Sequence, residues 1–322
     1  MPLLSVKNLT IHFDTPDGVV HAVDNVSFDI EKRSTLCVVG ESGCGKSVTA
    51  QSVLRLLPIP PGRIVSGEIL FEDKNVLAMN YQQLRSLRGN DIAMIFQDPM
   101  TSLNPVFTVG FQIMETLRLH QGLDEKNARE RAIHMLKAVH IPDAHKRVDE
   151  YPHQLSGGMR QRVMIAMALA CNPKLLIADE PTTALDVTIQ AQILDLLSEL
   201  KEKFHMALMF ITHDLGIVAQ IADEVLVLYA GKVAERGSAA DIYQNPKHPY
   251  TAGLLSSVPR LDSTEEKLTV IPGILPDPTA YGPECRFYSR CTRRTDTCKI
   301  APEEFTMGKD THKAACYHTD VK

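Results

Sequence analysis

The sequence predicts an α/β fold in three parts: a mostly parallel sheet covered by helices, an inserted helical subdomain, and a small loop-rich C-terminal extension. Short apolar runs alternate with helical patterns, as in parallel sheets whose strands are joined by helices. From about residue 98 to 161 only helical patterns occur. Between Pro259 and Pro283, five prolines interrupt a segment without clear periodicity. We therefore expect a main domain over residues 1–258, its helical subdomain at about 98–161, and an extension over 259–322.

The individual elements follow from the spacing of apolar residues. A helix is expected after the N-cap Asp186, because apolar residues recur every three or four positions from Ile189 to Phe204. Helices are also expected over Val109–Gln121 and Glu125–Val139. Short apolar runs predict six strands. These are Leu36–Val39, Glu68–Phe71, Ile92–Ile95, Leu175–Ala178, Leu208–Thr212 and Glu224–Tyr229.

The composition is that of an ordinary globular protein. Of 322 residues, 44% are apolar and 23% charged, which excludes a collagen, a coiled-coil rod or a disordered tail. The net charge of −5 provides no global basic field for nucleic acid or an anionic membrane. The first ten residues lack a secretory signal pattern, and no apolar run approaches the roughly 18 residues of a membrane span. We expect a soluble chain that can dock on a membrane protein.

The first apolar run is followed by the pattern G-x-x-x-x-G-K-[ST] of phosphate-binding loops. Its members are Gly40, Glu41, Ser42, Gly43, Cys44, Gly45, Lys46 and Ser47. Glycines let backbone N–H groups turn inward around phosphate oxygens, and the next helix adds partial positive charge at its N-terminus. Lys46 is expected to reach the β- and γ-phosphates, and the Ser47 hydroxyl to ligate Mg²⁺. Cys44 stands at a variable position and is expected to have no chemical role.

Two adjacent carboxylates end the strand Leu175–Ala178. In a parallel sheet the C-terminal ends of strands face the ligand crevice. Asp179 is therefore expected to hold Mg²⁺, and Glu180 to orient or deprotonate the attacking water. Alone, the pattern is equally typical of a solvated acidic turn, and the phosphate-binding loop is what favours the metal site.

A second glycine motif lies within Leu155–Gln161. Ser156 is expected to be the N-cap of a helix that continues through the apolar run Val163–Ala170. Gly157 and Gly158 would leave backbone N–H groups exposed at the start of that helix, which makes a second anion site. A lone Ser-Gly-Gly is usually a turn, but this one precedes the acidic strand by about twenty residues.

On these motifs, in their order and spacing, the chain resembles the ATP-binding cassette (ABC) ATPases of membrane transporters from its start to about Ser257. The resemblance implies a P-loop NTPase of the ABC type with ATP and Mg²⁺ as ligands. Residues 40–47 look like the Walker A loop, and Leu155–Met159 look like the signature motif. Asp179 and Glu180 look like the Walker B acid and the catalytic glutamate.

The resemblance assigns further roles. Gln97 matches the Q-loop residue, which touches Mg²⁺ and the transmembrane partner, and Ala184–Asp186 match the D-loop. His213 matches the switch histidine, which senses the γ-phosphate, and Phe13 stands where an aromatic residue usually stacks on adenine. Taken singly, Gln97 is also typical of a loop, His213 of a helix cap and Phe13 of a core.

In this family two subunits pack head to tail. Each ATP then lies between the Walker A loop of one chain and the signature motif of the other. The resemblance implies that Ser156, Gly157 and Gly158 close on the γ-phosphate of ATP bound by a neighbouring chain. ATP would join the subunits and hydrolysis would release them, with catalysis mainly by positioning and electrostatics.

Two segments, Phe96–Pro105 and Asn245–Thr251, resemble the peptide-importer branch of the family. This implies the ATP-hydrolysing subunit of a bacterial importer for di- or oligopeptides. The expected partners are a second, different ATPase subunit, two transmembrane permease subunits and an extracytoplasmic substrate-binding protein, with no nucleic acid. The expected location is peripheral, on the cytoplasmic face of the inner membrane. Nickel and antimicrobial-peptide importers share much of this pattern and stay open as alternatives.

Two other classes fit less well. Cassette ATPases of DNA repair or translation typically carry a coiled-coil insertion or two cassettes, together with basic surfaces, whereas this chain has one cassette and an acidic balance. A stand-alone regulatory nucleotide-binding module would tolerate the loss of Glu180 or His213, and both are present.

Four cysteines crowd the extension. Cys285, Cys291, Cys298 and Cys316 are separated by five, six and seventeen residues. Four thiolates suit either Zn²⁺ or an iron–sulfur cluster, and the absence of the short spacing of zinc knuckles favours the cluster. The family resemblance implies a [4Fe–4S] cluster with a structural or sensing role. Four unliganded buried thiols are the alternative.

Overall fold

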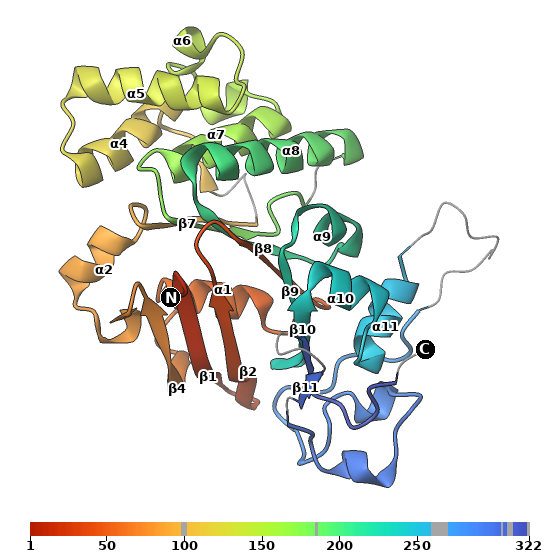
Figure 1. The fold of residues 1–322 in the computed structure, drawn as a ribbon. Helices are drawn as coiled ribbons and strands as arrows, with labels where there is room; N and C mark the ends of the chain where they lie inside the picture. The colour runs from red at the N-terminus through yellow and green to blue at the C-terminus, as the bar shows by residue number, and fades with distance from the viewer. Residues whose placement is uncertain (98–101, 184–185, 259–269, 304, 308–311, 321–322) are drawn as a thin grey trace. The chain divides into compact units, whose positions relative to one another are not determined.

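The computed structural model describes residues 1–97, 102–183, 186–258, 270–303, 305–307 and 312–320. The chain forms two compact units (Figure 1). The first unit consists of residues 1–30, 35–77 and 211–322, and the second of residues 31–34 and 78–210. The chain returns from the second unit to the first within strand β8 (Ala207–Thr212).

The first unit begins with an antiparallel sheet. Its order is β2-β1-β4-β5, with bounds β1 (Leu4–Thr15), β2 (Gly18–Ile30), β4 (Gly62–Phe71) and β5 (Lys74–Asn75). Sequence analysis predicted only the end of β4. The apolar residues of β1 do not keep a strict alternation, because its register with β2 shifts between Val6 and Leu9 and again before Ile11. Such irregularities remove the period-two pattern that identifies a strand.

The second sheet region of this unit surrounds β3 (Thr35–Val39), every residue of which is buried. It pairs in parallel with β9 (Glu224–Tyr229), which confirms both strands and their predicted direction. Beyond β9 the pairing becomes antiparallel, through β10 (Lys232–Ser238), β12 (His312–Ala314) and β11 (Phe305–Met307). The helices of this unit are α1 (Lys46–Val53), α9 (Leu215–Ile221), α10 (Ala239–Gln244) and α11 (Pro249–Ser256).

The second unit combines parallel strands with a set of helices. Strand β6 (Ile92–Ile95) pairs in parallel with β7 (Leu175–Asp179), and β8 is the next neighbour. The predicted helix Val109–Gln121 is α4, with the same bounds, and the next is α5 (Glu125–Ala138). Figure 1 shows α4, α5 and α7 grouped within this unit. The other helices are α2 (Tyr81–Leu87), α6 (Ala144–Arg147), α7 (Gly157–Leu169), α8 (Val187–Phe204), η1 (Val76–Ala78, at the boundary of the units) and η2 (Pro152–Gln154).

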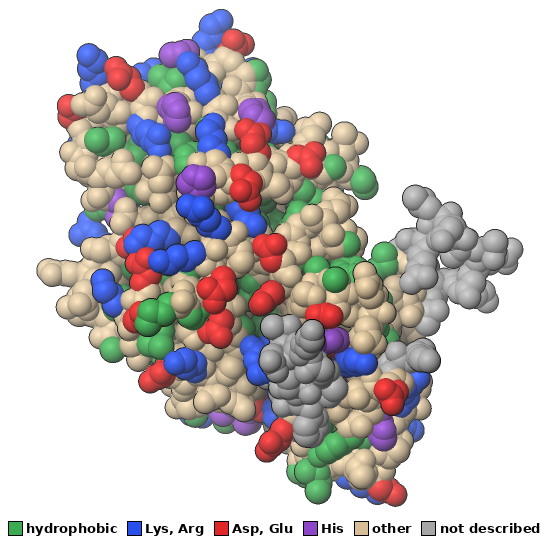
Figure 2. Space-filling view, in the orientation of Figure 1, with side chains coloured by type: hydrophobic (Ala, Val, Ile, Leu, Met, Phe, Trp, Pro, Cys, Tyr) green, Lys and Arg blue, Asp and Glu red, His purple; other side chains and the backbone are tan. Residues whose placement is uncertain are grey.

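The extension belongs to the first unit, and strand pairing as well as loops joins it to the rest of that unit. Strand β12 pairs with β10, and Nε2 of His312 lies 2.7 Å from Oε1 of the buried Glu235. The extension contains two short 3₁₀ helices. The first, η3 (Tyr288–Arg290), lies between Cys285 and Cys291, and the second, η4 (Asp296–Lys299), contains Cys298. On the face shown in Figure 2, basic and acidic side chains are interspersed. Among the described helices, none has the length and apolar character to cross a bilayer.

Candidate functional site

The glycine-rich loop lies between β3 and α1, in the first unit. Gly40 has φ 151°, and a Cβ there would lie 2.2 Å from the carbonyl oxygen of Leu228. Gly45 has φ 102°, and a Cβ there would lie 2.5 Å from the carbonyl oxygen of Ala22. Both positions therefore require glycine. The predicted strand–loop–helix context of a phosphate-binding loop is present.

The lysine of the motif turns back onto its own loop. Lys46 is 5% exposed, and its Nζ donates hydrogen bonds to the carbonyl oxygens of Gly40 (2.8 Å) and Glu41 (3.0 Å). An ammonium group held at a glycine-rich loop, at the N-terminus of α1, suits a phosphate group. Ser47, the expected Mg²⁺ ligand, is the second residue of α1 and is half-buried.

Two side chains that sequence analysis did not assign to the site hold the loop at Glu41. The Glu41 N–H donates to Oη of Tyr250 (2.9 Å), and the Glu41 carboxylate accepts from both terminal nitrogens of Arg290 (2.8 and 3.1 Å). These partners lie 209 and 249 residues away along the chain. No local pattern could have identified them.

The other loop residues differ in exposure. Ser42 and Gly43 are exposed, whereas Cys44 is fully buried. Burial raises the pKa of the Cys44 thiol above its ordinary value, although the nearby Lys46 lowers it. A buried, protonated thiol is a poor nucleophile. The absence of a chemical role for Cys44 stays a prediction.

The acidic strand end lies in the second unit. Asp179 is the last residue of β7 and is 3% exposed. Glu180 follows in a left-handed conformation with φ 47°, which turns the chain sharply. Its Oε2 accepts hydrogen bonds from Nε2 of Gln97 (3.0 Å) and from Oγ1 of Thr183 (3.1 Å). The structure thus brings two of the expected catalytic residues, Gln97 and Glu180, into direct contact.

The second glycine motif begins α7 of the same unit. Ser156 is its N-cap, and its Oγ accepts from the N–H of Met159 (3.3 Å), as predicted. A Cβ at Gly157 would meet no described atom within 4 Å, so this residue presents an open backbone surface. A Cβ at Gly158 would lie 3.1 Å from Ile189. In addition, Nε2 of Gln161 donates to the carbonyl oxygen of Pro181 (2.6 Å), which ties α7 to the turn after Glu180.

Three other predicted residues are placed as follows. His213 follows β8 and is exposed, in the first unit, and the adjacent Asp214 rather than His213 is the N-cap of α9. Asp186 is the N-cap of α8, whereas residues 184–185 lie outside the described part of the chain, as do residues 98–101 of the segment after Gln97. Phe13 lies in β1, opposite Val20 and half-buried.

The four cysteines of the extension are free and lie near one another. Burial raises the pKa of Cys316 to about 11, and the nearby Cys285, Cys291 and Cys298 act in the same direction. The backbone N–H of Arg293 donates to Sγ of Cys291 (3.4 Å), and that of His318 to Sγ of Cys316 (3.3 Å). In the part of the chain that the structure describes, no group of three or more His, Cys, Asp or Glu residues is arranged to hold a metal ion.

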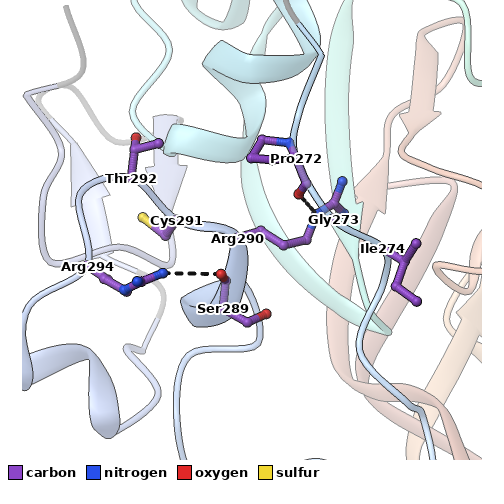
Figure 3. Close-up of a pocket in the computed structure, with 8 residues that line it drawn as sticks. All are labelled: Pro272, Gly273, Ile274, Ser289, Arg290, Cys291, Thr292 and Arg294. Atoms are coloured by element: carbon purple, nitrogen blue, oxygen red, sulfur yellow. Dashed lines mark hydrogen bonds between the residues drawn. The ribbon is translucent and has the colours of Figure 1, made fainter.

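A cavity of about 750 Å³ opens beside this region (Figure 3). The described residues that line it come from two segments, Pro272–Ile274 and Ser289–Arg294. In Figure 3 the Arg290 side chain extends toward Pro272, and its Nε donates a hydrogen bond to the carbonyl oxygen of that residue (2.8 Å). Arg294 instead donates to the carbonyl oxygen of Ser289 (3.2 Å). The cavity is distinct from the glycine-rich loop, although Arg290 borders both.

Comparisons with known proteins cover almost the whole chain. The family model "ABC transporter" matches residues 23–183, and the model "Oligopeptide/dipeptide transporter, C-terminal region" matches residues 234–298. The chain is 52% identical to the dipeptide transport ATP-binding protein DppD of Bacillus subtilis (strain 168), over 99% of this chain and 96% of that one. It is 53% identical to the oligopeptide transport ATP-binding protein OppD of Haemophilus influenzae, over 95% and 94%.

Solved structures of ATP-binding cassettes match about three quarters of the chain. The ATP-binding cassette MJ0796, solved as a dimer in a post-hydrolysis state bound to ADP and Pi, aligns with a TM-score of 0.65 at 27% identity. The match covers 73% of this chain and 98% of that one. The protein cbiO1 of Clostridium perfringens, part of an ABC transporter complex, aligns with a TM-score of 0.64 at 29% identity, over 76% and 91%.

Proposed function

The chain belongs to the ABC transporter ATPases, in their dipeptide/oligopeptide branch, and from that premise we propose that it hydrolyses ATP to drive the import of di- or oligopeptides. The observation that carries this function is the 52% identity to a dipeptide transport ATP-binding protein across 99% of the chain. Nickel or antimicrobial-peptide import is the alternative substrate class. Substrate choice would reside in the membrane and binding-protein partners.

The phosphate-binding loop supplies the nucleotide grip in this proposal. Backbone N–H groups of residues 40–47 and the Lys46 ammonium bind the β- and γ-phosphates, because both present positive charge to the anion. Phe13 stacks on the adenine. Ser47, Gln97 and Asp179 would hold Mg²⁺, which neutralises charge on the phosphates and fixes their orientation. The buried position of Asp179 at a strand end supports its role as an oxygen ligand.

Glu180 acts on the attacking water in this proposal, and Gln97 orients Glu180. The hydrogen bonds from Gln97 and Thr183 both reach Oε2 of Glu180, and they support an oriented carboxylate that accepts a proton from the attacking water. His213 senses the γ-phosphate. Ser156, Gly157 and Gly158 complete the site of a partner chain, and the open backbone at Gly157 supports this role. The dimeric relative bound to ADP and Pi provides a precedent for nucleotide in a cassette dimer.

The proposed assembly contains a second, different ATPase subunit, two transmembrane permease subunits and an extracytoplasmic binding protein. The chain would attach peripherally to the cytoplasmic face of the inner membrane through the permease. The division into a cassette over residues 1–258 and an extension over 259–322 stays a prediction.

We also propose a [4Fe–4S] cluster on Cys285, Cys291, Cys298 and Cys316. The donor chemistry fits, since cysteine sulfurs are the ligands of iron–sulfur clusters and two of these four sulfurs accept backbone N–H bonds, which stabilise thiolates. The described arrangement does not itself form a metal-binding group, so loading would require the sulfurs to converge. Iron analysis and visible absorbance of protein purified without oxygen test this. Colourless protein with one bound zinc would overturn it.

Reconstitution tests the main proposal. The subunit would be combined with candidate permease subunits in proteoliposomes, together with their binding protein, and ATP turnover measured with and without peptide. Peptide is expected to stimulate turnover. Stable association with ribosomes or DNA, without permease binding, would instead favour a non-transport cassette ATPase. Stimulation by nickel rather than by peptide would reassign the substrate.

A further inference from the structure

The segment between the first two cysteines of the extension reaches the phosphate-binding loop. Residues 285–291 form a short turn around η3, and within it Arg286 and Arg290 both bind the nucleotide-binding part of the first unit. Arg286 donates to the carbonyl oxygen of Ala230 and pairs with Asp24. Arg290 pairs with Glu41, the second residue of the loop.

The Arg290–Glu41 pair has the geometry of a strong interaction. Two parallel N–H donors meet the two carboxylate oxygens at 2.8 and 3.1 Å, the bidentate form that fixes both partners in orientation. The Arg290 side chain is 5% exposed and that of Glu41 28%. Nε of Arg290 also donates to the carbonyl oxygen of Pro272 at 2.8 Å, so the guanidinium cannot rotate away without losing a third bond.

The base of this segment is anchored among aromatic rings. Phe287 is 4% exposed, and its ring centroid lies 5.1 Å from that of Tyr229 and 5.5 Å from that of Tyr250. Tyr250 in turn accepts the backbone N–H of Glu41. Glu41 is therefore held twice, at its backbone by Tyr250 and at its carboxylate by Arg290.

The position of Glu41 is connected to the phosphate-binding lysine. Nζ of Lys46 donates to the carbonyl oxygen of Glu41 (3.0 Å). A shift of Glu41 would move this acceptor, and with it the resting position of the lysine. We propose that Arg290 is a positioning residue for the phosphate-binding loop, so that the cysteine-bearing extension sets the affinity of the chain for ATP. This inference rests on the proposed function, since it concerns the same nucleotide site.

A direct electrostatic role would have a different signature from a positioning role. If Arg290 merely added positive charge near the phosphates, loss of Arg290 would weaken ATP binding but loss of the Glu41 carboxylate would strengthen it. If the pair positions the loop, both losses weaken binding. The double substitution then costs no more than the larger single one, because residues that act as a pair are not additive.

The test measures ATP–Mg²⁺ affinity of the purified full chain with a fluorescent ATP analogue. Arg290→Ala and Glu41→Ala are each expected to raise Kd about tenfold, the effect of losing a charged hydrogen-bonded pair. Arg290→Lys should recover part of the loss, since it keeps the charge but not the bidentate geometry. Arg294→Ala is the matched control, because it removes the same charge from the same extension at a side chain that donates to Ser289 instead.

Thermal melting of each variant separates affinity from folding. If Arg290→Ala does not fold, Glu41→Ala decides, since this partly exposed side chain lies on the loop itself. Tighter ATP binding by folded Glu41→Ala, unchanged binding by folded Arg290→Ala, or an additive double variant would overturn the inference. If the wild-type chain does not bind ATP–Mg²⁺, the proposed function fails instead, and the two failures are thereby distinguished.

Discussion

The side-chain amide of Gln97 donates a hydrogen bond of 3.0 Å to Oε2 of Glu180. This contact follows from strand register, because Ile95 of β6 pairs with Ala178 of β7 in a parallel ladder. Gln97 and Glu180 each lie two residues past that pair, at neighbouring C-terminal strand ends. Two motif residues that are 83 positions apart along the chain therefore meet at one edge of the sheet.

The first prediction concerns Glu180. Glu180→Gln is expected to reduce ATP turnover by at least a hundredfold, because an amide cannot accept the proton of the attacking water. ATP binding should stay intact, since the phosphate-binding loop is unchanged. Turnover and equilibrium ATP binding are measured on the same preparation.

Thr183→Val is the matched control for this substitution, because it removes a hydrogen bond to the same oxygen but keeps the carboxylate. It should reduce ATP turnover far less than Glu180→Gln. Normal hydrolysis by Glu180→Gln would remove the glutamate from its assigned role.

The fold could be predicted where the signal is local. Buried parallel strands such as β3 and β7 are continuous apolar runs, and α4 has a clear apolar spacing. The antiparallel part was missed for physical reasons. The bulges in β1 break its alternation. The two-residue turn from β9 into β10 has Ala230 at φ 48° and Gly231 at φ 80°; alanine rarely adopts such a conformation, so only the single glycine marked this hairpin.

The residues of the candidate site could likewise be predicted only where the signal is local in the sequence. Motif residues such as Lys46 and Ser156 could be predicted because the chemistry expected of them depends on a few consecutive residues. Arg290 and Tyr250 were not, because their relation to Glu41 exists only in the folded chain. The sequence placed Arg290 beside the cysteines, and nothing in its neighbours indicated a partner so far away.

The second prediction concerns Gly157. Gly157→Ala should fold at least as well as the wild type, because the added methyl meets no described atom within 4 Å and alanine favours a helix by about 1 kcal/mol over glycine. Assembly should nevertheless suffer, since the methyl would stand where a partner's phosphate approaches the backbone. ATP-dependent association with the second ATPase subunit, measured by light scattering in the Glu180→Gln background, is expected to be lost. Gly122→Ala is the opposite control. Gly122 is the C-cap of α4 with φ 64°, so alanine there should lower stability while this association is retained.

The third prediction joins the cysteines to ATP. Cys285→Ser with Cys291→Ser should loosen the segment that carries Arg290 and raise the Kd for ATP by a factor comparable to Arg290→Ala. Combined with Arg290→Ala, the cysteine substitutions should add little, because both changes act through the same contact. Cys171→Ser is the control, since this thiol lies in the second unit, where its pKa is raised to about 11 by burial. An additive triple variant would show that the cysteines act by another route.

The fourth prediction concerns pH and His248. This side chain is 4% exposed, and burial lowers its pKa to about 4, although the nearby Glu235 opposes the shift. Its Nδ1 accepts the N–H of Tyr250 (3.0 Å) at the start of α11, a role that only an unprotonated nitrogen can fill. The unfolded chain takes up a proton near pH 6.5, whereas the folded chain resists it until about pH 4. Stability from this group is therefore complete above pH 6.5 and declines as the pH falls toward 4.

Between pH 7 and pH 5 this loss amounts to about 2 kcal/mol of unfolding free energy. His248→Asn should remove it, because asparagine is a neutral N-cap residue that can accept the same hydrogen bond at every pH. Urea unfolding at a series of pH values measures the difference in slope between variant and wild type. His205→Asn makes the same chemical change at an exposed position that already has a left-handed backbone. If both variants flatten the profile equally, the pH dependence does not come from the burial of His248.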